Sequence, residues 1–202
     1  RKLHNYIKSK LISGVLSTSK SQMKVLDLSC GRGGDINKYI NNVKTNVSLL
    51  VGIDISSNIH EACLRFYDDK DKCKGVFIRG DTSKNILDGN VADVDGGDKK
   101  DKKHTETMLS ILYNKKSKIS EEYKVIKDRY LGLASNGFDI ISSQFSMHYY
   151  FKDSKTFDGF ITNLVENTKK GGYFIGTCYD GNKIFDFFEK RKETMDKYKA
   201  IE

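Results

Sequence analysis

The sequence lacks proline and tryptophan altogether and contains only four cysteines. Without proline, neither the (D/N)PP(Y/F) tetrapeptide of amino-group DNA methylases nor the Pro-Cys pair of cytosine-C5 methylases can be present. The cysteines show no CxxC or Cys/His spacing, so we expect reduced thiols and no metal site. No apolar stretch is long enough to span a bilayer, and the basic first residues do not resemble a signal peptide, so no membrane partner is expected.

The chain carries an excess of positive charge. Its 202 residues have a formal net charge of +8 and a sequence pI of about 9.1, which suits a polyanionic partner such as a nucleic acid. Ten Lys/Arg against five Asp/Glu lie between residues 99 and 129, so this segment alone accounts for +5. The charge therefore favours a nucleic-acid partner only modestly, and a solvated lysine-rich surface remains an alternative.

Short apolar runs alternate with segments of helical spacing along the chain. Hydrophobic residues make up 38% of the sequence, which is enough for one domain with a buried core, assigned here to residues 1–202. Strands are expected at 24–29, 48–54, 76–79, 138–143 and 173–177, and helices at 1–17, 34–42, 58–69, 153–168 and 181–200. The alternation predicts an α/β fold with an open, doubly wound, mostly parallel sheet.

The segment 88–136 interrupts this alternation. Residues 88–101 are mainly Asp, Gly and Lys, which predicts a solvated, partly disordered loop. Residues 105–131 regain apolar positions and are expected to form one or two surface helices. We interpret 88–136 as a flexible and helical insertion within the domain. It either contacts nucleic-acid phosphates or serves as a lysine-rich spacer.

The segment VLDLSCGRGGD at residues 25–35 indicates which small molecule the chain holds. An apolar run containing Asp27, followed by glycines, predicts a strand, a tight turn and a helix. The spacing departs from the GxGxxG turn that places a pyrophosphate on a helix N-terminus. It resembles instead the acidic-x-Gly-x-Gly-x-Gly loop of class I S-adenosylmethionine methyltransferases, with Ser29 in place of the first glycine.

Two acids follow the next two expected strands, Asp54 after the second and Asp81 after the third. An acid after the second strand can accept both hydroxyls of a ribose. An acid after the third can meet an adenine amino group. Either acid alone is more often a capping or turn residue. As a pair in sheet register they favour a nucleoside cofactor at the carboxyl ends of parallel strands.

A third block follows the fourth expected strand. The sequence SQFSMHYYF at residues 143–151, together with GGYFIGT at 171–177 and LHNYIKS at 3–9, resembles the mRNA cap guanine-N7 methyltransferases. The resemblance runs from residue 1 to about 188, and NIH at 58–60 is most similar to members from large DNA viruses or protists. It implies a Rossmann-like class I methyltransferase sheet, S-adenosylmethionine as the cofactor and capped RNA as the substrate.

The resemblance also implies a set of cofactor-binding residues. Lys8 would pair with the carboxylate of S-adenosylmethionine, Asp54 with the ribose hydroxyls and Asp81 with the adenine edge. Ser29 and Gly31 of the turn would line the methionine part of the cofactor. The implied cofactor-binding residues are Lys8, Asp27, Ser29, Gly31, Asp54, Asp81, Gln144 and Tyr149.

On the substrate side, the resemblance implies contacts with the guanine and with the cap phosphates. His148 matches the residue that reaches the guanine edge. The arginine that family members have just before the tyrosine of the second helix is displaced here, where the order is Arg65-Phe66-Tyr67. The implied cap-binding residues are His4, Asn5, Arg32, Lys38, Arg65 and His148.

The chemistry implied by the resemblance needs no acid or base. Guanine N7 carries a lone pair and no proton at neutral pH, so its attack on a sulfonium methyl requires alignment and a suitable electrostatic environment. We therefore expect His148 and Tyr149 to act by positioning, and we expect no metal.

Two alternatives stay open. One is S-adenosylmethionine-dependent methylation of another RNA base or of a small molecule. The other is a non-catalytic methyltransferase-like module in a capping complex. Family members continue with further strands that supply a glutamate and an aromatic residue to the cap pocket. We therefore expect a chain truncated at its C-terminus, lacking the terminal strands, that binds cofactor with weak or absent turnover. The expected partners are capped RNA and other capping-enzyme domains, in the nucleus or, for a virus, in the cytoplasm.

Overall fold

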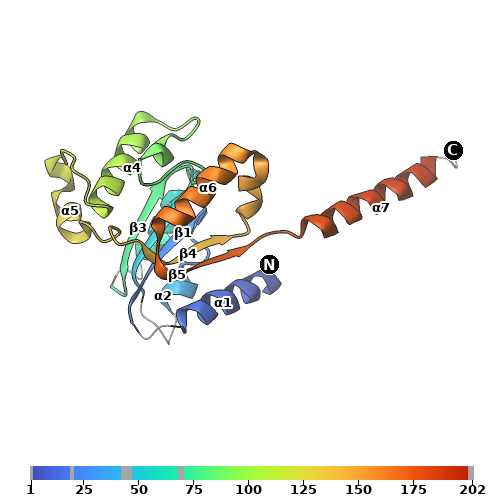
Figure 1. Cartoon of the computed structure of the whole chain (residues 1–202), viewed down its shortest axis with the longest axis horizontal. Helices are drawn as coiled ribbons and strands as arrows, with labels where there is room; N and C mark the ends of the chain where they lie inside the picture. The colour runs from blue at the N-terminus through green and yellow to red at the C-terminus, as the bar shows by residue number, and fades with distance from the viewer. Residues whose placement is uncertain (1, 19–20, 42–46, 68–70, 200–202) are drawn as a thin grey trace.

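A computed structural model describes residues 2–18, 21–41, 47–67 and 71–199 (Figure 1). Its centre is a single sheet of five parallel strands in the order β3-β2-β1-β4-β5. The strands are β1 (Met23–Leu28), β2 (Val47–Asp54), β3 (Lys74–Arg79), β4 (Phe138–Gln144) and β5 (Thr168–Thr177). The strand order reverses between β1 and β4, and in open α/β sheets ligands bind outside the carboxyl ends of the strands at such a point.

Helices cover both faces of the sheet. One face packs against α1 (Lys2–Leu16), α2 (Ile36–Ile40) and α3 (Ile59–Tyr67), and the other against α4 (Lys99–Leu112) and α6 (Ser154–Asn167). In Figure 1, α1 and α2 lie below the sheet and α4 and α6 above it. Neighbouring strand residues alternate between the faces: Val25 packs with α1, whereas Leu26 packs with α4.

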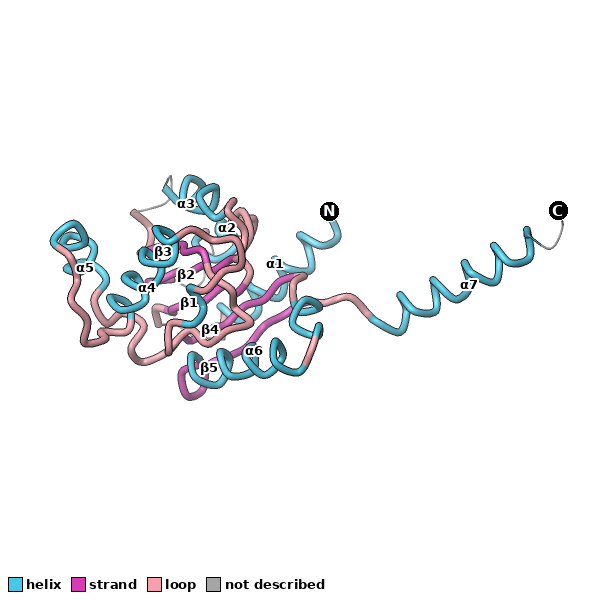
Figure 2. The backbone as a smooth tube through the Cα atoms, turned by 90° about the horizontal axis from the view of Figure 1, so that it is seen from above, coloured by secondary structure: helices cyan, strands magenta, loops and turns pink. Residues whose placement is uncertain are grey.

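The remaining described elements are two helices and three short 3-10 turns. They are α5 (Lys124–Tyr130), α7 (Gly181–Lys199) and the 3-10 turns η1 (Asn90–Ala92), η2 (Glu121–Tyr123) and η3 (Met147–Lys152). Figures 1 and 2 both show α7 leading away from the rest of the domain. None of the helices in the described ranges combines the length and the apolar character of a membrane span.

The predicted strands and helices are confirmed, with shifted ends. The helix predicted at 34–42 is shorter, because α2 ends at Ile40. The last strand begins at Thr168 rather than at 173, because Thr168 already pairs with Phe138 before the chain bulges out through residues 169–172 and pairing resumes at Tyr173. The predictions for residues 1, 42, 68–69 and 200 lie outside the described residues.

The prediction of a solvated, partly disordered loop at 88–101 holds for the exposed residues 95–98 and is wrong for the rest of the segment, where Val91 and Ala92 are buried and α4 begins at Lys99. Val91 is fully buried, and its carbonyl accepts a hydrogen bond from the N–H of Asp81 at 2.8 Å. The following helix starts at Lys99 and buries Leu109 and other apolar residues in the core on one face of the sheet. The buried residues are one short apolar turn and one face of a helix, and lysines and aspartates surround both in the sequence. The average composition of the segment therefore does not predict this burial.

Candidate functional site

The glycine turn joins β1 to α2 and lies against the end of β2. Its backbone is left-handed at Ser29 (φ 63°), Gly31 (φ 56°) and Gly33 (φ 73°). The N–H of Ser29 donates to the carbonyl of Ile53 with an N···O distance of 2.8 Å. A Cβ added at Gly31 would meet no atom within 4 Å, so the turn borders open space there. A turn of this shape lets a ligand approach its backbone closely.

Asp54 ends β2 and is only 8% exposed. Its Oδ2 accepts the N–H of Gly31 at 2.7 Å, and its Oδ1 accepts the N–H of Ser56 at 2.8 Å. The carboxylate therefore holds the glycine turn in place. Since an ionised carboxylate offers about four acceptor positions, it still has acceptor capacity for the ribose hydroxyls that the sequence assigns to it.

Asp81 shapes the turn after β3. Its Oδ1 accepts hydrogen bonds from the N–H of Ser83 at 3.0 Å and from the Ser83 hydroxyl at 2.7 Å. Lys84 Nζ lies 3.6 Å from its Oδ2. The predicted contact of Asp81 with an adenine amino group stays a prediction, because the carboxylate also has this local role.

Tyr150 connects the turns that follow β1 and β3. Its hydroxyl lies 2.9 Å from Oγ of Ser29 and 2.6 Å from Oγ1 of Thr82. Its ring is buried and stacks on Phe160 with a centroid distance of 4.1 Å. Burial raises the pKa of Tyr150 above its usual value, so the hydroxyl stays protonated at neutral pH and can act as a donor.

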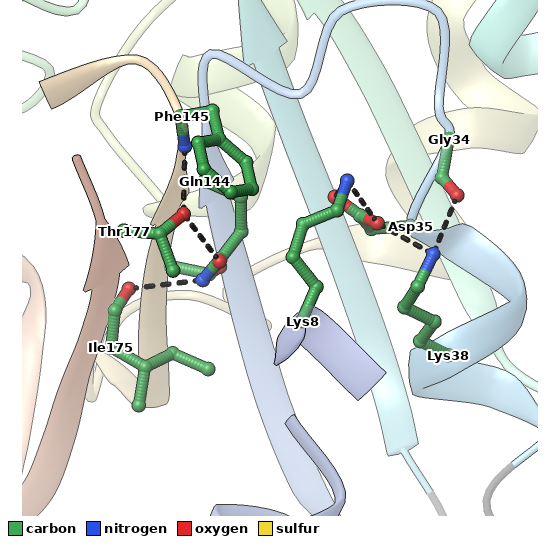
Figure 3. Close-up of polar contacts among 9 residues, drawn as sticks. Lys8, Gly34, Asp35, Lys38, Gln144, Phe145, Ile175 and Thr177 are labelled. Atoms are coloured by element: carbon green, nitrogen blue, oxygen red, sulfur yellow. Dashed lines mark hydrogen bonds and ion pairs between the residues drawn. The ribbon is translucent and has the colours of Figure 1, made fainter. Parts of the chain in front are cut away.

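Lys8 and Lys38 converge on one carboxylate, that of Asp35 (Figure 3). Each ammonium nitrogen lies 2.7 Å from Oδ1 of Asp35, and Lys38 also donates to the carbonyl of Gly34 at 3.1 Å. All three side chains are at most 15% exposed. Two positive charges against one negative charge leave this group cationic, which suits the carboxylate of a ligand. The sequence assigned Lys8 to the cofactor and Lys38 to the cap, and the structure brings them together.

Asp27 is buried on β1 beside this group. Burial raises the pKa of Asp27 well above its usual range, and the negative charges of Asp35 and Asp54 raise it further. The positive charges of Lys8 and Lys38 act in the opposite direction. The glycine turn therefore has a mixed set of charges beneath it, in a part of the protein where charge interactions are poorly screened.

Gln144 ends β4, and Phe145 follows it. The Gln144 amide is held by three contacts shown in part in Figure 3: Nε2 donates to Ser142 Oγ at 3.0 Å and to the Ile175 carbonyl at 3.4 Å, and Oε1 accepts from Thr177 Oγ1 at 3.1 Å. The Phe145 backbone is left-handed (φ 57°) and its N–H donates to Thr177. This conformation, unusual for a residue with a large side chain, turns the Phe145 ring towards α1, where it stacks on His4 at 4.5 Å.

An aromatic cluster (His4, Phe145, His148, Tyr149 and Tyr179) continues from this ring. The centroid of His148 lies 4.1 Å from that of Tyr149 and 5.2 Å from that of Tyr179. Nδ1 of His148 is buried and has no hydrogen-bond partner among the described residues. Tyr149 is 70% exposed. A buried ring nitrogen without a partner is an unsatisfied hydrogen-bonding group, and the exposed ring of Tyr149 beside it offers a flat surface for stacking.

The other predicted cap-binding residues lie outside the aromatic cluster. Arg32 is exposed, and its Nη1 lies 3.4 Å from Oε1 of Glu61 on α3. Asn5 and Arg65 are exposed on α1 and α3, and neither side chain has a hydrogen bond or ion pair within the described ranges. Among the predicted cap-binding residues, the aromatic cluster contains His4 and His148.

Several residues of the site were not predicted. They are Asp35, Thr82, Phe145, Tyr150 and Tyr179. The sequence offers a signal for two of them: Asp35 directly follows the paired glycines of the turn, and Phe145 stands between the predicted Gln144 and His148. The roles of the others depend on contacts across the sheet. The described residues include no group of three or more His, Cys, Asp or Glu able to hold a metal ion.

Comparisons with known proteins assign the chain to a family. A family model described as "mRNA (guanine-N(7))-methyltransferase domain" matches residues 1–200. A probable mRNA-capping enzyme of Acanthamoeba polyphaga mimivirus is 28% identical, and the match covers 98% of this chain and 15% of that protein. The mRNA cap guanine-N(7) methyltransferase of Drosophila melanogaster is 30% identical, and the match covers 91% of this chain and 37% of the fly protein.

A solved structure is similar in fold. The PH0226 protein of Pyrococcus horikoshii superposes with a TM-score of 0.51 at 16% identity, and the match covers 97% of this chain and 63% of that structure. The matches thus cover 98% and 91% of this chain but only 15% and 37% of the lengths of the two curated relatives. The sheet order, the glycine turn at the carboxyl edge and the match over residues 1–200 together lead to one conclusion. The chain belongs to the mRNA (guanine-N7) methyltransferase family, with the class I methyltransferase fold.

Proposed function

We propose that this chain binds S-adenosylmethionine and transfers its methyl group to N7 of the guanosine cap of mRNA. The observation that carries the proposal is the position of His148, whose buried and unpartnered Nδ1 lies within an aromatic cluster that also contacts Lys8 across Phe145. A cap-sized aromatic ligand in the aromatic cluster and a cofactor whose carboxylate pairs with Lys8 would therefore lie at neighbouring places. The family match supports the same chemistry.

The residues around the glycine turn fit the proposed cofactor. Open space lies beside Gly31, where the backbone allows close approach. The cationic group of Lys8 and Lys38 suits a ligand carboxylate, and Asp54 retains acceptor positions for hydroxyls. S-adenosylmethionine would supply an electrophilic methyl group bound to a positively charged sulfur.

The protein's own part is to bind and orient the two reactants. Guanine N7 has a free lone pair, so no side chain needs to remove a proton before the methyl group moves. The aromatic cluster would hold the guanine ring. Nδ1 of His148, as a hydrogen-bond acceptor or donor, would fix the position of the guanine edge. Correct alignment of the two reactants can account for a large part of the rate increase of such a reaction.

A transfer assay tests the proposal. The protein is incubated with S-adenosylmethionine labelled in the methyl group and with RNA ending in GpppG, and the product is mapped by nuclease digestion. We expect label at N7 of the cap guanosine. Label in another base or in a small molecule, or cofactor binding without binding of GpppG, would contradict the proposal. Action on nascent mRNA implies a location inside the cell, in the nucleus or, for a viral protein, in the cytoplasm. Association with other capping-enzyme domains stays a prediction.

A further inference from the structure

A hollow lies at the opposite edge of the sheet from the glycine turn. It has a volume of about 900 Å³ and is lined by the first residues of three strands, among them Lys24, Val47 and Lys74. Because all strands are parallel, these amino ends face away from the carboxyl ends that carry the candidate site. Arg129, at the end of α5, lines the same hollow.

The charge of this hollow is mainly positive. Its lining includes the cationic side chains of Lys24, Lys72, Lys74 and Arg129, against one carboxylate, that of Asp71. Within the described part of the chain, Lys24, Lys74 and Arg129 form no ion pair with a carboxylate. Three positive charges held in one hollow without an ion-pair partner among the described residues favour an anionic ligand.

The two strand lysines also have a structural contact. Lys24 Nζ donates to the carbonyl of Leu133 at 2.6 Å, and Lys74 Nζ donates to the carbonyl of Arg129 at 3.0 Å. These bonds attach the end of α5 to the sheet. An ammonium group has three N–H donors, so each lysine keeps donors for a further acceptor. The exposed guanidinium of Arg129 has no hydrogen bond with a described residue, which leaves all of its donors available.

We propose that this basic hollow binds phosphate groups of the RNA chain that follows the cap. The proposal rests on the proposed function, since capped RNA is the polyanion that this domain would hold. Single-stranded RNA carries one negative charge per nucleotide, and lysine and arginine contacts with its phosphates need no particular base sequence. The hollow would therefore add affinity for long transcripts of any sequence.

The length of the sheet sets the RNA length required. The eight residues of β2 span the distance between the two edges, which is about 26 Å at roughly 3.3 Å per residue. A stacked strand advances about 3.4 Å per nucleotide. Because the RNA has to follow the surface and not this straight line, at least about eight nucleotides beyond the cap are needed to reach from the candidate site to the hollow.

Arg129→Gln provides the most direct test, because the guanidinium forms no hydrogen bond or ion pair within the described residues. It lies over the ring of the neighbouring Tyr130, 5.6 Å from the ring centroid. The probe is uncapped oligouridylate of 20 nucleotides, and its binding is followed by fluorescence anisotropy at several salt concentrations. We expect Arg129→Gln to weaken binding roughly fivefold and to reduce the slope of log affinity against log salt by about 0.7. Lys74→Gln combined with Arg129→Gln should weaken binding roughly 25-fold if the two contacts are independent.

The matched control is Lys127→Gln on the same helix, which makes the same change of charge outside the hollow. It should leave the affinity and the salt slope unchanged. Unchanged binding by the double variant, or an equal loss in the control, would overturn the proposal. A double variant that no longer binds inorganic tripolyphosphate but still binds the RNA as the parent does would also overturn the proposal. That result would assign the hollow to a small phosphate compound. Uncapped RNA does not test the cap site, so failure of the proposed methylation would leave these results unaffected.

Discussion

The hydroxyl of Tyr150 lies 2.9 Å from the hydroxyl of Ser29, the residue that occupies the place of a glycine in the cofactor turn. Ser29 has a left-handed backbone (φ 63°), which costs free energy for a residue with a Cβ. The hydrogen bond to a buried tyrosine, itself held by Thr82 at 2.6 Å, offsets part of that cost. A serine is therefore tolerated at this position because a side chain from η3 holds it.

Removing this hydroxyl should weaken cofactor binding. We expect Tyr150→Phe to lower the affinity for S-adenosylmethionine about fivefold to tenfold, since a net contribution of roughly 1 kcal/mol is typical of one such hydrogen bond. Calorimetric titration measures the effect. In a Ser29→Gly background the same Tyr150→Phe change should have little effect, because glycine adopts the left-handed conformation unaided. An equal loss in both backgrounds would show that Tyr150 acts through Thr82 alone.

Asp54→Ala should lower cofactor affinity far more. The change removes the acceptor of two backbone N–H groups, those of Gly31 and Ser56, as well as the predicted contact with the ribose. We expect a loss of about 100-fold, roughly 3 kcal/mol. Asp93→Ala, which removes an exposed carboxylate paired with Lys102, serves as the control and should bind normally. Normal affinity in Asp54→Ala would contradict both the site and the proposed cofactor.

His148→Ala should separate cap binding from cofactor binding. The imidazole is proposed to contact the guanine and has no hydrogen bond through Nδ1 to lose among the described residues. We expect affinity for GpppG to fall at least about tenfold, with affinity for S-adenosylmethionine unchanged, as measured by fluorescence titration of each ligand. His104→Ala removes a surface histidine that contacts Tyr123 and should change neither affinity. Cap affinity retained by His148→Ala would remove the main support for the cap assignment.

The buried Asp27 should make stability depend on pH. Burial raises its pKa in the folded protein, so between about pH 4, near the usual value of an aspartate, and the raised value the folded state holds a proton that the unfolded chain has released. The contribution of Asp27 to the free energy of unfolding should therefore fall as pH rises through this window. Asp27→Asn cannot lose a proton, so urea unfolding at a series of pH values should show the variant gaining stability relative to the parent as pH rises. A difference that is constant with pH would contradict this.

The strands could be predicted because a strand that is buried on both faces is a nearly continuous apolar run in the sequence. These runs also alternate with segments of helical spacing. It predicted Asp54 and Asp81 at the carboxyl edge for the same reason: parallel strands end at one edge, so residues following them lie close together. The burial of α4 was missed. Its apolar positions, such as Leu109 and Leu112, stand among lysines, and only the helical period separates the two faces.

Contacts between distant segments could not be predicted from spacing. Lys8 and Lys38 stand on different helices, and only the packing of α1 against α2 brings both to Asp35. The link between Ser29 and Tyr150 likewise joins residues 121 positions apart. Such polar groups follow no period in the sequence, because each is placed by the packing of the apolar residues around it.

The contact between Gly159 on α6 and the loop after β3 gives a final prediction. A Cβ at Gly159 would lie 1.8 Å from the carbonyl oxygen of Ser83, a backbone atom that cannot move aside by a change of rotamer. Nearby, Asn163 donates to the carbonyl of Thr82 and accepts from the N–H of Ile86, both at 2.9 Å, so the loop is already fixed to the helix. Gly159→Ala must therefore separate α6 from the loop.

We expect Gly159→Ala to destabilise the fold by about 2–3 kcal/mol, within the range of overpacking substitutions, and to lower the melting temperature by roughly 5–10 °C. Cofactor affinity should also fall, because the displaced loop carries Thr82, the second partner of Tyr150. Gly14→Ala is the matched control: it lies in α1, where an added Cβ would meet no atom within 4 Å, and alanine should stabilise the helix by roughly 0.5–1 kcal/mol. If both variants had a higher melting temperature than the parent, the prediction would be wrong. α6 and the loop would then lie farther apart than the distance of 1.8 Å between the added Cβ and the Ser83 oxygen indicates.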